Sequence, residues 1–230
     1  MSKYINNIKE QFKGKVVVIT GSTQGIGAET AKLFASRGAK AITICGRNEK
    51  NGLKIKKEIE KIGSNCLFVK ADLAEVEDCR NIILSTVKKF KTINSLINIA
   101  GFTERGTILS TTLDNYEKNF NINTRAPFLL MQETIKIMRR DKIKGTIANI
   151  LSMAAYSGMP FLTAYSSSKG ALAIMIKNVA NAVVADQIRV NGLNIGWTDT
   201  PGETITQKKF HNKSDNWVKK TEKKLPFKRL

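Results

Sequence analysis

Short apolar runs, many of them β-branched, alternate along the chain with longer amphipathic stretches. The apolar runs predict six strands, at residues 15–20, 39–45, 65–69, 95–99, 145–151 and 188–193. The amphipathic stretches predict helices at residues 28–37, 49–62, 75–90, 121–140 and 163–185. Strands that alternate with helices of this length predict a parallel sheet covered on both faces. With right-handed crossovers, we expect a doubly wound, Rossmann-like α/β fold in a single domain, residues 1–230.

The composition indicates that this domain is globular and soluble. Of its 230 residues 42% are hydrophobic, and no apolar run approaches the ~20 residues of a membrane span. Residues 1–15 lack the apolar core of a signal peptide. The three cysteines show no C-x-x-C spacing, which argues against a disulfide framework and a zinc site. We expect a cytoplasmic protein with no metal, and the single histidine, His211, is a poor base for a Ser-His-Asp hydrolase.

The formal net charge of +19 is the unusual feature of the composition. A basic chain can bind nucleic acid or anionic membranes through charge attraction alone. The lysines, however, are spread along amphipathic segments such as residues 50–61, and no arginine-rich block is interleaved with aromatic residues. We therefore expect neither a membrane nor a nucleic acid as partner, and strongly salt-dependent retention on DNA would contradict this.

A glycine-rich loop follows the first predicted strand and precedes a helix. It reads Thr20-Gly21-Ser22-Thr23-Gln24-Gly25-Ile26-Gly27. In this context glycines let the backbone turn tightly and approach a pyrophosphate, and the helix N-terminus supplies N–H groups and a positive dipole. The spacing is G-x-x-x-G-x-G, which differs from the common G-x-G-x-x-G fingerprint. The loop predicts a dinucleotide site, and the alternative is a turn needed only for packing.

Tyr165 and Lys169 lie one helical turn apart, and Ser152 lies thirteen residues upstream of the tyrosine. At that spacing the phenol and the ammonium share one face of a helix. A neighbouring cation lowers the pKa of a tyrosine, which can then transfer a proton near neutral pH. A serine hydroxyl nearby could hold the oxygen that gains or loses this proton. Alone, Y-x-x-x-K is more typical of an ordinary surface helix; the glycine-rich loop favours the catalytic interpretation.

Together these motifs resemble the short-chain dehydrogenase/reductase family, in order, from about residue 14 to residue 201. The loop at residues 20–27 resembles the family's T-G-x-x-x-G-x-G motif, and residues 98–101 resemble its N-N-A-G motif. Further matches are the adenine-contacting aspartate, the helix asparagine, the catalytic serine and Y-x-x-x-K: Asp72, Asn123, Ser152, Tyr165 and Lys169. Two departures, Ile99 for the second asparagine of N-N-A-G and Ile195 for a proline before Gly196, affect local geometry but remove no proton-transfer group.

The resemblance implies hydride transfer between a nicotinamide and a ketone or secondary alcohol. Tyr165 would be the general acid or base, Lys169 would lower its pKa and bind the nicotinamide ribose, and Ser152 would bind the substrate oxygen. Asn123 would hold a water that links Lys169 to solvent. The implied cofactor-binding residues are Thr20, Gly21, Ser22, Gln24, Gly25, Ile26, Gly27, Arg47, Asp72, Leu73, Asn98, Ala100, Gly101, Tyr165, Lys169, Gly196, Thr198 and Thr200.

The end of the second predicted strand predicts NADP rather than NAD. Gly46 stands where the family pattern has an acidic residue, and Arg47 follows it. A guanidinium suits a 2′-phosphate by charge and fork geometry, whereas no carboxylate is present to bind a 2′-hydroxyl. The alternative is an ordinary exposed arginine at the start of a helix.

Substrate contacts are expected from loops beyond the carboxyl ends of the strands. The candidates are Thr103, Glu104, Ala154, Tyr156, Met159, Phe161, Trp197 and the segment after Thr200. These residues could equally well only pack the loops. A 3-oxoacyl thioester, as in a 3-oxoacyl reductase, is one substrate class; sugars, steroids and small ketones stay open.

Residues 224–230 resemble the L-P-x-x-R stretch that precedes the family's final helix and seventh strand. We therefore expect a domain that is C-terminally short for the family, lacks those two elements and has its sixth strand at the sheet edge. A homodimer or homotetramer is expected if the chain were full length. The alternative function is a truncated family member that binds the nucleotide but is impaired in catalysis.

Overall fold

The computed structural model describes residues 8–211 and 216–229. Its centre is one parallel sheet of six strands in the order β3-β2-β1-β4-β5-β6, so the predicted single α/β domain is confirmed. The strands are β1 (Val16–Ile19), β2 (Ala41–Gly46), β3 (Asn65–Lys70), β4 (Ser95–Asn98), β5 (Thr146–Ser152) and β6 (Arg189–Ile195). All six were predicted from apolar runs, and their ends differ from the prediction by a few residues.

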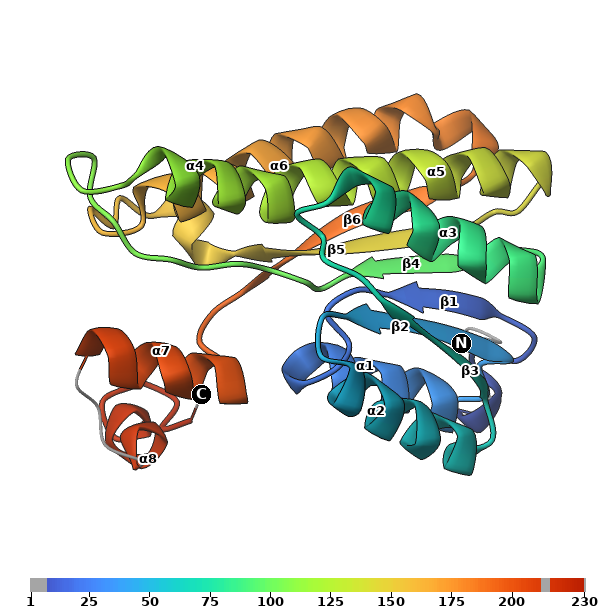
Figure 1. The fold of residues 1–230 in the computed structure, drawn as a ribbon, viewed down its shortest axis with the longest axis horizontal. Helices are drawn as coiled ribbons and strands as arrows, with labels where there is room; N and C mark the ends of the chain where they lie inside the picture. Colours follow the sequence, from blue (N-terminus) through green and yellow to red (C-terminus); the bar gives the residue numbers. More distant parts are fainter. Residues whose placement is uncertain (1–7, 212–215, 230) are drawn as a thin grey trace.

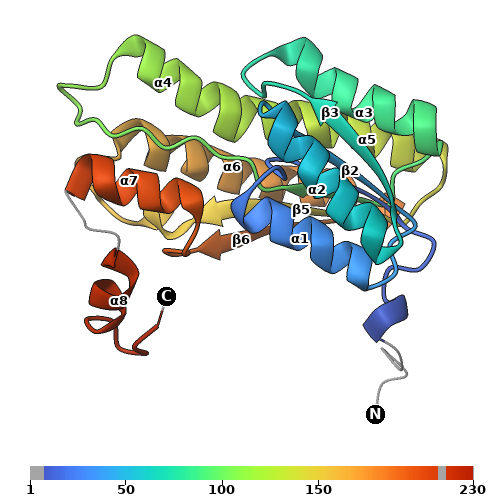
Figure 2. The same cartoon turned by 60° about the horizontal axis from the view of Figure 1, so that its bottom comes forward.

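Helices cover the sheet on two sides (Figures 1 and 2). The helices α1 (Gly25–Ser36) and α2 (Glu49–Ile62) lie on one face, and α3 (Val76–Phe90), α5 (Ala126–Arg140) and α6 (Thr163–Ala182) lie on the other. Strands β1 and β2 are buried along almost their whole length, because both of their faces are covered. Side chains that alternate along these strands therefore enter two separate apolar clusters, one under each helical layer.

The ends of α2 show why its predicted range is confirmed. The side chain of Asn48 accepts a hydrogen bond of 2.9 Å from the backbone N–H of Asn51, which caps the first turn. At the other end Gly63 has φ of 116°, a left-handed conformation that ends the helix and that glycine adopts without strain. Capping residues are local in sequence, so both limits could be predicted.

The range 121–140, predicted to be mostly helix, is helical throughout, but its first five residues are not α-helical. The chain there forms α4 (Leu113–Phe120), then a five-residue π-helical segment, η2 (Asn121–Arg125), and only then α5. Because a π-helical turn widens the backbone, it changes which carbonyls are paired, and such turns are frequent at functional sites. Helix α1 also begins three residues earlier than predicted, within the glycine-rich loop, and α6 ends earlier.

Two helices beyond β6 were not predicted, α7 (Pro201–His211) and α8 (Trp217–Glu222). In Figure 1 they form a separate lobe beside the carboxyl ends of the central strands. Trp217 of α8 is buried and donates its indole N–H to Thr204 of α7 across 3.1 Å. Proline in the first turn of α7 was the available sequence signal.

Strand β6 is the edge of the sheet in the part of the chain that the structure describes, as predicted. Val190 is its one buried residue and packs in the α5 and α6 layer, whereas Leu193 is 60% exposed. The expected helical cover on both faces is therefore incomplete at this strand among the described residues. The same residues contain no helix long and apolar enough for a membrane span and no metal-binding cluster of His, Cys, Asp or Glu.

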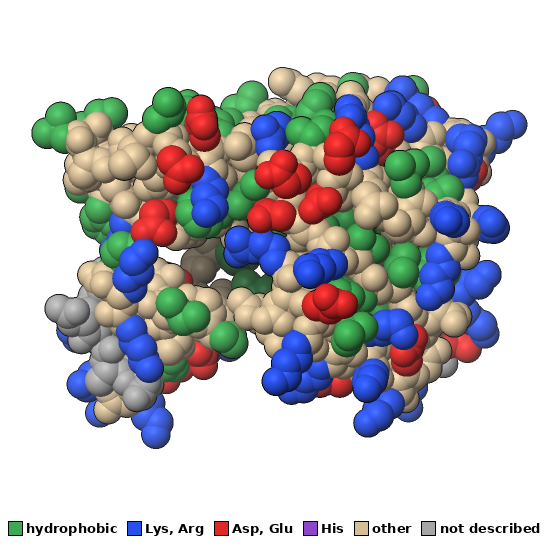
Figure 3. Space-filling model, viewed as in Figure 1, with side chains coloured by type: hydrophobic (Ala, Val, Ile, Leu, Met, Phe, Trp, Pro, Cys, Tyr) green, Lys and Arg blue, Asp and Glu red, His purple; other side chains and the backbone are tan. Residues whose placement is uncertain are grey.

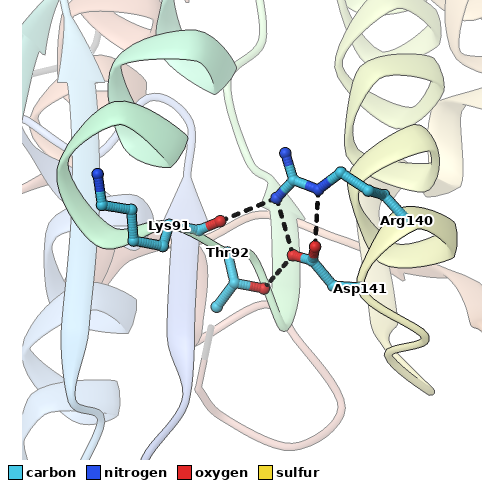
Figure 4. Close-up of polar contacts among 4 residues, drawn as sticks. All are labelled: Lys91, Thr92, Arg140 and Asp141. Carbon is cyan, nitrogen blue, oxygen red and sulfur yellow. Dashed lines mark hydrogen bonds and ion pairs between the residues drawn. The ribbon is translucent and has the colours of Figure 1, made fainter.

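A polar cluster ties α3 to α5 at the amino end of the sheet (Figure 4). Arg140 donates to the main-chain carbonyl of Lys91 at 2.9 Å and pairs with Asp141 at 2.7 Å. Thr92 donates its hydroxyl to the same carboxylate at 2.7 Å. These hydrogen bonds lower the pKa of Asp141, and the one from Arg140 has the larger effect. The cluster fixes the turn before β4 and lies at the end of the sheet opposite to the glycine-rich loop.

Candidate active site

A first cavity, of about 200 Å³, lies at the carboxyl ends of β1 to β4. Seven of the predicted cofactor-binding residues line it: Gly21, Gln24, Arg47, Asp72, Leu73, Ala100 and Gly101. Residues that had not been assigned to the cofactor also line it: Thr23, Cys45, Gly46, Ala71, Phe102 and Ile122. The cavity joins four loops that are far apart in sequence, because parallel strands bring their carboxyl ends to one edge.

Three glycines of the glycine-rich loop set its course, and one of them, Gly21, lines this cavity. Gly21 has φ of 62°, and a Cβ on it would lie 2.7 Å from the Cα of Ala100. A Cβ on Gly27 would collide with the carbonyl oxygen of Gly21. Gly25 also has positive φ, of 54°, in the first residue of α1. Side chains at Gly21 and Gly27 would collide with neighbouring backbone, so the tight course of the loop depends on these glycines.

The N-terminus of α1 is open toward this cavity. Its N-cap residue, Gln24, lines the cavity and makes no side-chain capping hydrogen bond. By contrast, α2 and α4 are capped by the side chains of Asn48 and Thr112. Uncapped N–H groups with the positive end of the helix dipole favour an anion. The residues present therefore fit the pyrophosphate of a dinucleotide.

Some predicted cofactor residues support the loop with their side chains. The hydroxyl of Thr20 accepts hydrogen bonds from the N–H groups of Ile99 and Ala100, at 3.0 and 3.2 Å. Ser22 is fully buried and joins the carbonyl of Ile19 to the N–H of Cys45. These bonds fix the glycine-rich loop against β2 and β4.

Asn98 is a second buried support. Its side chain donates to the amide oxygen of Asn149 on β5 at 2.8 Å. The side chain is thus directed into the sheet and does not line the cavity. A cofactor contact of Asn98 stays a prediction.

Arg47 and Asp72 face each other at the rim of the cavity. Their side chains are 68% and 40% exposed, and Nη1 of Arg47 lies 3.9 Å from Oδ2 of Asp72. A Cβ on Gly46 would lie 2.7 Å from the side chain of Thr23. The acidic side chain that the family pattern has at position 46 would therefore not fit here without movement of Thr23. Nearby Cys45 is inert, because burial raises the pKa of its thiol to about 12.

A second cavity, of about 280 Å³, contains the predicted proton-transfer groups. Ser152 ends β5 and Tyr165 lies in the first turn of α6, and both line the cavity. The hydroxyl of Ser152 accepts a hydrogen bond of 3.1 Å from the N–H of Ala154. Within the described residues, no hydrogen bond joins the Tyr165 hydroxyl to Ser152 or Lys169. Ser152 and Tyr165 therefore share the wall of one cavity, in which a substrate oxygen could lie.

Lys169 lies behind Tyr165 on α6 and is almost completely buried. Its Nζ donates to the main-chain carbonyl of Ile150 at 2.8 Å and lies 3.7 Å from the position of a Cβ on Gly101. Burial lowers the pKa of this ammonium to about 8, because the protein interior disfavours its charge. Lys169 thus lies between the tyrosine of the second cavity and a glycine that lines the first.

Asn123 holds the segment that both cavities share. Its amide accepts from the N–H of Phe102 and donates to the carbonyl of the same residue, both at 2.8 Å. It also donates to the hydroxyl of Ser168, 3.0 Å away on α6. The side chain is thus a clamp between η2, α6 and the loop after β4. The predicted water contact of Asn123 stays a prediction.

The remaining predicted residues lie in the segment between β6 and α7. Gly196 lines the second cavity. Thr200 accepts a hydrogen bond of 3.1 Å from the N–H of Glu203, and its side chain lies 3.5 Å from the position of a Cβ on Gly25. Thr198 is half-buried between them, and Ile26 lies in the first turn of α1. This segment therefore passes beside the glycine-rich loop before α7 begins.

The substrate candidates from the sequence divide into two groups. Thr103, Ala154, Met159 and Trp197 line the second cavity, as do Glu203 and Thr206 from the segment after Thr200. Glu104, Tyr156 and Phe161 do not line it. Sequence reasoning missed Arg105, Met153, Leu162 and Ile195, which also line it. No motif indicates these four residues, because they come from four separate places: the loop after β4, the turn after β5, the residue before α6 and the end of β6.

The comparisons with known proteins agree with this site. The short chain dehydrogenase family matches residues 15–210 of the chain. An uncharacterized oxidoreductase of Thermotoga maritima is 34% identical over 219 residues, which cover 95% of this chain and 85% of that protein. General stress protein 39 of Bacillus subtilis is 31% identical over 206 residues, 86% of this chain and 71% of that protein.

A solved structure extends the likeness to the fold. L-Sorbose reductase from Gluconobacter frateurii, in complex with NADPH and L-sorbose, superposes with a TM-score of 0.88 at 28% identity. The match covers 95% of this chain and 85% of that one. The glycine-rich loop, the Ser152–Tyr165–Lys169 arrangement and these matches lead to one conclusion. The chain belongs to the short-chain dehydrogenase/reductase family of oxidoreductases, which act on CH–OH and carbonyl groups.

Proposed function

We propose that the protein is an NADP-dependent oxidoreductase that interconverts a ketone and a secondary alcohol. The observation that carries this proposal is the position of Lys169, buried between the cavity beside the glycine-rich loop and the cavity of Ser152 and Tyr165. A bound nicotinamide cofactor would supply or accept the hydride.

The residues of the second cavity have distinct roles in this reaction. Tyr165 transfers the proton to or from the substrate oxygen, and Ser152 donates a hydrogen bond to that oxygen. Lys169 lies one helical turn after Tyr165 on α6 and holds its positive charge in the protein interior. Because burial already lowers the pKa of Lys169 to about 8, this charge is present at neutral pH and is lost in mildly alkaline solution.

The preference for NADP rests on the rim of the first cavity. Arg47 is exposed there and can turn its guanidinium to a 2′-phosphate. Position 46 carries no carboxylate, and Thr23 occupies the space beside it. NADPH is also the cofactor bound to the L-sorbose reductase that this chain resembles.

The test combines cofactor binding and turnover. Purified protein is titrated with NADPH, and NADPH oxidation is then followed with a panel of ketones and aldehydes. Tyr165→Phe should lower turnover by about 10²- to 10⁴-fold, because the proton donor is lost. Its dissociation constant for NADPH should stay unchanged, because the hydroxyl faces the other cavity.

Two results would count against the proposal. Substantial residual turnover by Tyr165→Phe would remove Tyr165 from its catalytic role. NADPH binding without oxidation across the panel would support the alternative, a nucleotide-binding protein impaired in catalysis.

A further inference from the structure

Arg105 is the only lysine or arginine among the residues that line the cavity of Ser152 and Tyr165 in the described chain. It lies in the loop after β4. The carbon at the centre of its guanidinium is 4.7 Å from the ring centroid of Phe161 and 5.2 Å from that of Phe210. One ring comes from the loop before α6 and the other from α7. Contacts with two aromatic rings hold the guanidinium in place at the cavity wall.

Glu203 brings an opposite charge to the same cavity. It lies in the first turn of α7, where its N–H donates to the hydroxyl of Thr200. Its carboxylate accepts a hydrogen bond of 2.6 Å from the side chain of Gln207, which is buried. Burial lowers the pKa of Arg105, and the charge of Glu203 acts in the opposite direction. The two charges are therefore close enough to influence each other.

Contacts outside the cavity fix α7 in this position. Lys209 of α7 pairs with Glu104 of the loop after β4 at 2.7 Å. Glu104 does not line the cavity, although it is the neighbour of Arg105. Figure 3 shows the hollow between the α7–α8 lobe and the rest of the molecule, with Lys and Arg side chains beside it. Glu203 of α7 therefore lines the cavity, and the Lys209–Glu104 ion pair helps to hold α7 in this position.

The donor and acceptor set of this wall selects a class of substrate. A guanidinium only donates hydrogen bonds, a carboxylate only accepts them, and a hydroxyl does both. Thr103 and Thr206 add two hydroxyls, and Met159 and Trp197 add apolar surface. A hydrocarbon chain would cover these polar side chains without offering them a hydrogen bond, which is costly. An anionic substrate would be repelled by the carboxylate of Glu203.

We propose that the substrate is a polyhydroxylated ketone or the corresponding polyol, whose hydroxyls are bound by Arg105 and Glu203. This inference rests on the proposed function, because it assigns the substrate of the same cavity. The hydroxyls use both charges at once, and the C–H faces of the molecule lie on Met159 and Trp197.

The test uses three ketones that share one four-carbon skeleton: erythrulose, butanone and acetoacetate. With NADPH, kcat/KM should be highest for erythrulose. Arg105→Met and Glu203→Gln should each lower it by about 10- to 100-fold, the effect of losing one charged hydrogen bond. The same variants should change kcat/KM for butanone by less than about threefold, because butanone has no hydroxyl to lose.

A control variant separates binding from the docking of α7. Glu104→Gln removes the ion pair with Lys209 but no group of the cavity wall. It should leave the preference for erythrulose over butanone unchanged. Equal losses for both ketones in Arg105→Met and Glu203→Gln would instead indicate that these residues only hold the fold.

Binding to the Tyr165→Phe protein keeps the inference testable without turnover. With NADP bound, calorimetry should detect erythritol, and Arg105→Met should weaken this binding at least tenfold. If erythritol binds in this way but no ketone is reduced, the proposed function fails, and only the binding of a polyol by Arg105 is retained. If butanone or acetoacetate is preferred, or erythritol does not bind, this inference fails and the proposed function can still stand.

Discussion

The two cavities of this protein are neighbours, yet they are built in different ways. The first cavity, proposed for the nucleotide, is made by loops at the ends of β1 to β4, and Gly21, Gly46 and Gly101 are among the residues that line it. The substrate cavity is made by side chains from β5, α6, the loop after β4 and α7. Residues 100–102 line the first cavity, and Thr103 and Arg105 line the second.

This difference predicts that the first cavity is general and the second specific. A pyrophosphate is bound by N–H groups and a helix N-terminus, which any sequence with the right backbone provides. A substrate is distinguished by side chains, and these can change while the strands that carry them stay the same. The predictions below test whether the backbone of the first cavity and the side chains of the second act separately.

The largest effect is expected from Gly27→Ala. A Cβ at this position collides with the carbonyl of Gly21, so the glycine-rich loop must move away from α1. NADPH binding should weaken by at least about 100-fold, roughly 3 kcal/mol, as measured by fluorescence titration. Gly170→Ala is the matched control, because no atom lies within 4 Å of a Cβ there, and it should leave NADPH binding intact.

The opposite result would contradict the proposed difference between the two cavities. If Gly27→Ala binds NADPH normally, the shape of the loop does not determine binding. The nucleotide would then depend on side chains, as the substrate does.

The next effect concerns the buried Lys169 and pH. Its pKa is lowered from the ordinary 10.5 to about 8 by burial, so between these values the unfolded chain holds a proton that the folded protein lacks. The free energy of unfolding therefore gains a contribution as pH rises through this window, whereas below about pH 8 the cost of the buried charge is constant. Denaturant unfolding of the cofactor-free protein should show this gain, about 3 kcal/mol over the whole window.

Two variants isolate this contribution. Lys169→Met should abolish the gain, because no group titrates at that position. Lys177→Met changes an exposed lysine of the same helix and should retain it. A gain that persists in Lys169→Met would show that another group is responsible.

The smallest effect concerns the rim of the nucleotide cavity. Arg47→Leu should weaken NADPH binding by about tenfold and leave NADH binding nearly unchanged, because only NADPH has a 2′-phosphate. Gly46→Asp alone should impair both cofactors, since its side chain meets Thr23. Gly46→Asp with Thr23→Gly should restore NADH binding selectively. Equal dissociation constants for NADPH and NADH in the unaltered protein would refute the role of Arg47.

Elements of the fold that have local sequence signals could be predicted, and elements that depend on distant contacts could not. Strands buried on both faces, such as β1, were found because their apolar runs are continuous, and α2 because Asn48 and Gly63 mark its ends. Helix α7 was not predicted, since only its proline is a local signal. The break at η2 was missed as well, because Asn123 is fixed there by Phe102 and Ser168, which are distant in sequence.

The sequence by itself determined the family, the sheet and the glycine-rich loop, and it indicated the three residues Ser152, Tyr165 and Lys169. It could do so because these features depend on spacing within one strand, turn or helix. Only the tertiary structure decided that Lys169 is buried beside Gly101 and that Arg105 and Glu203 share a cavity with Tyr165. Burial and the meeting of charges arise when distant segments pack together, and no local pattern in the chain records that packing.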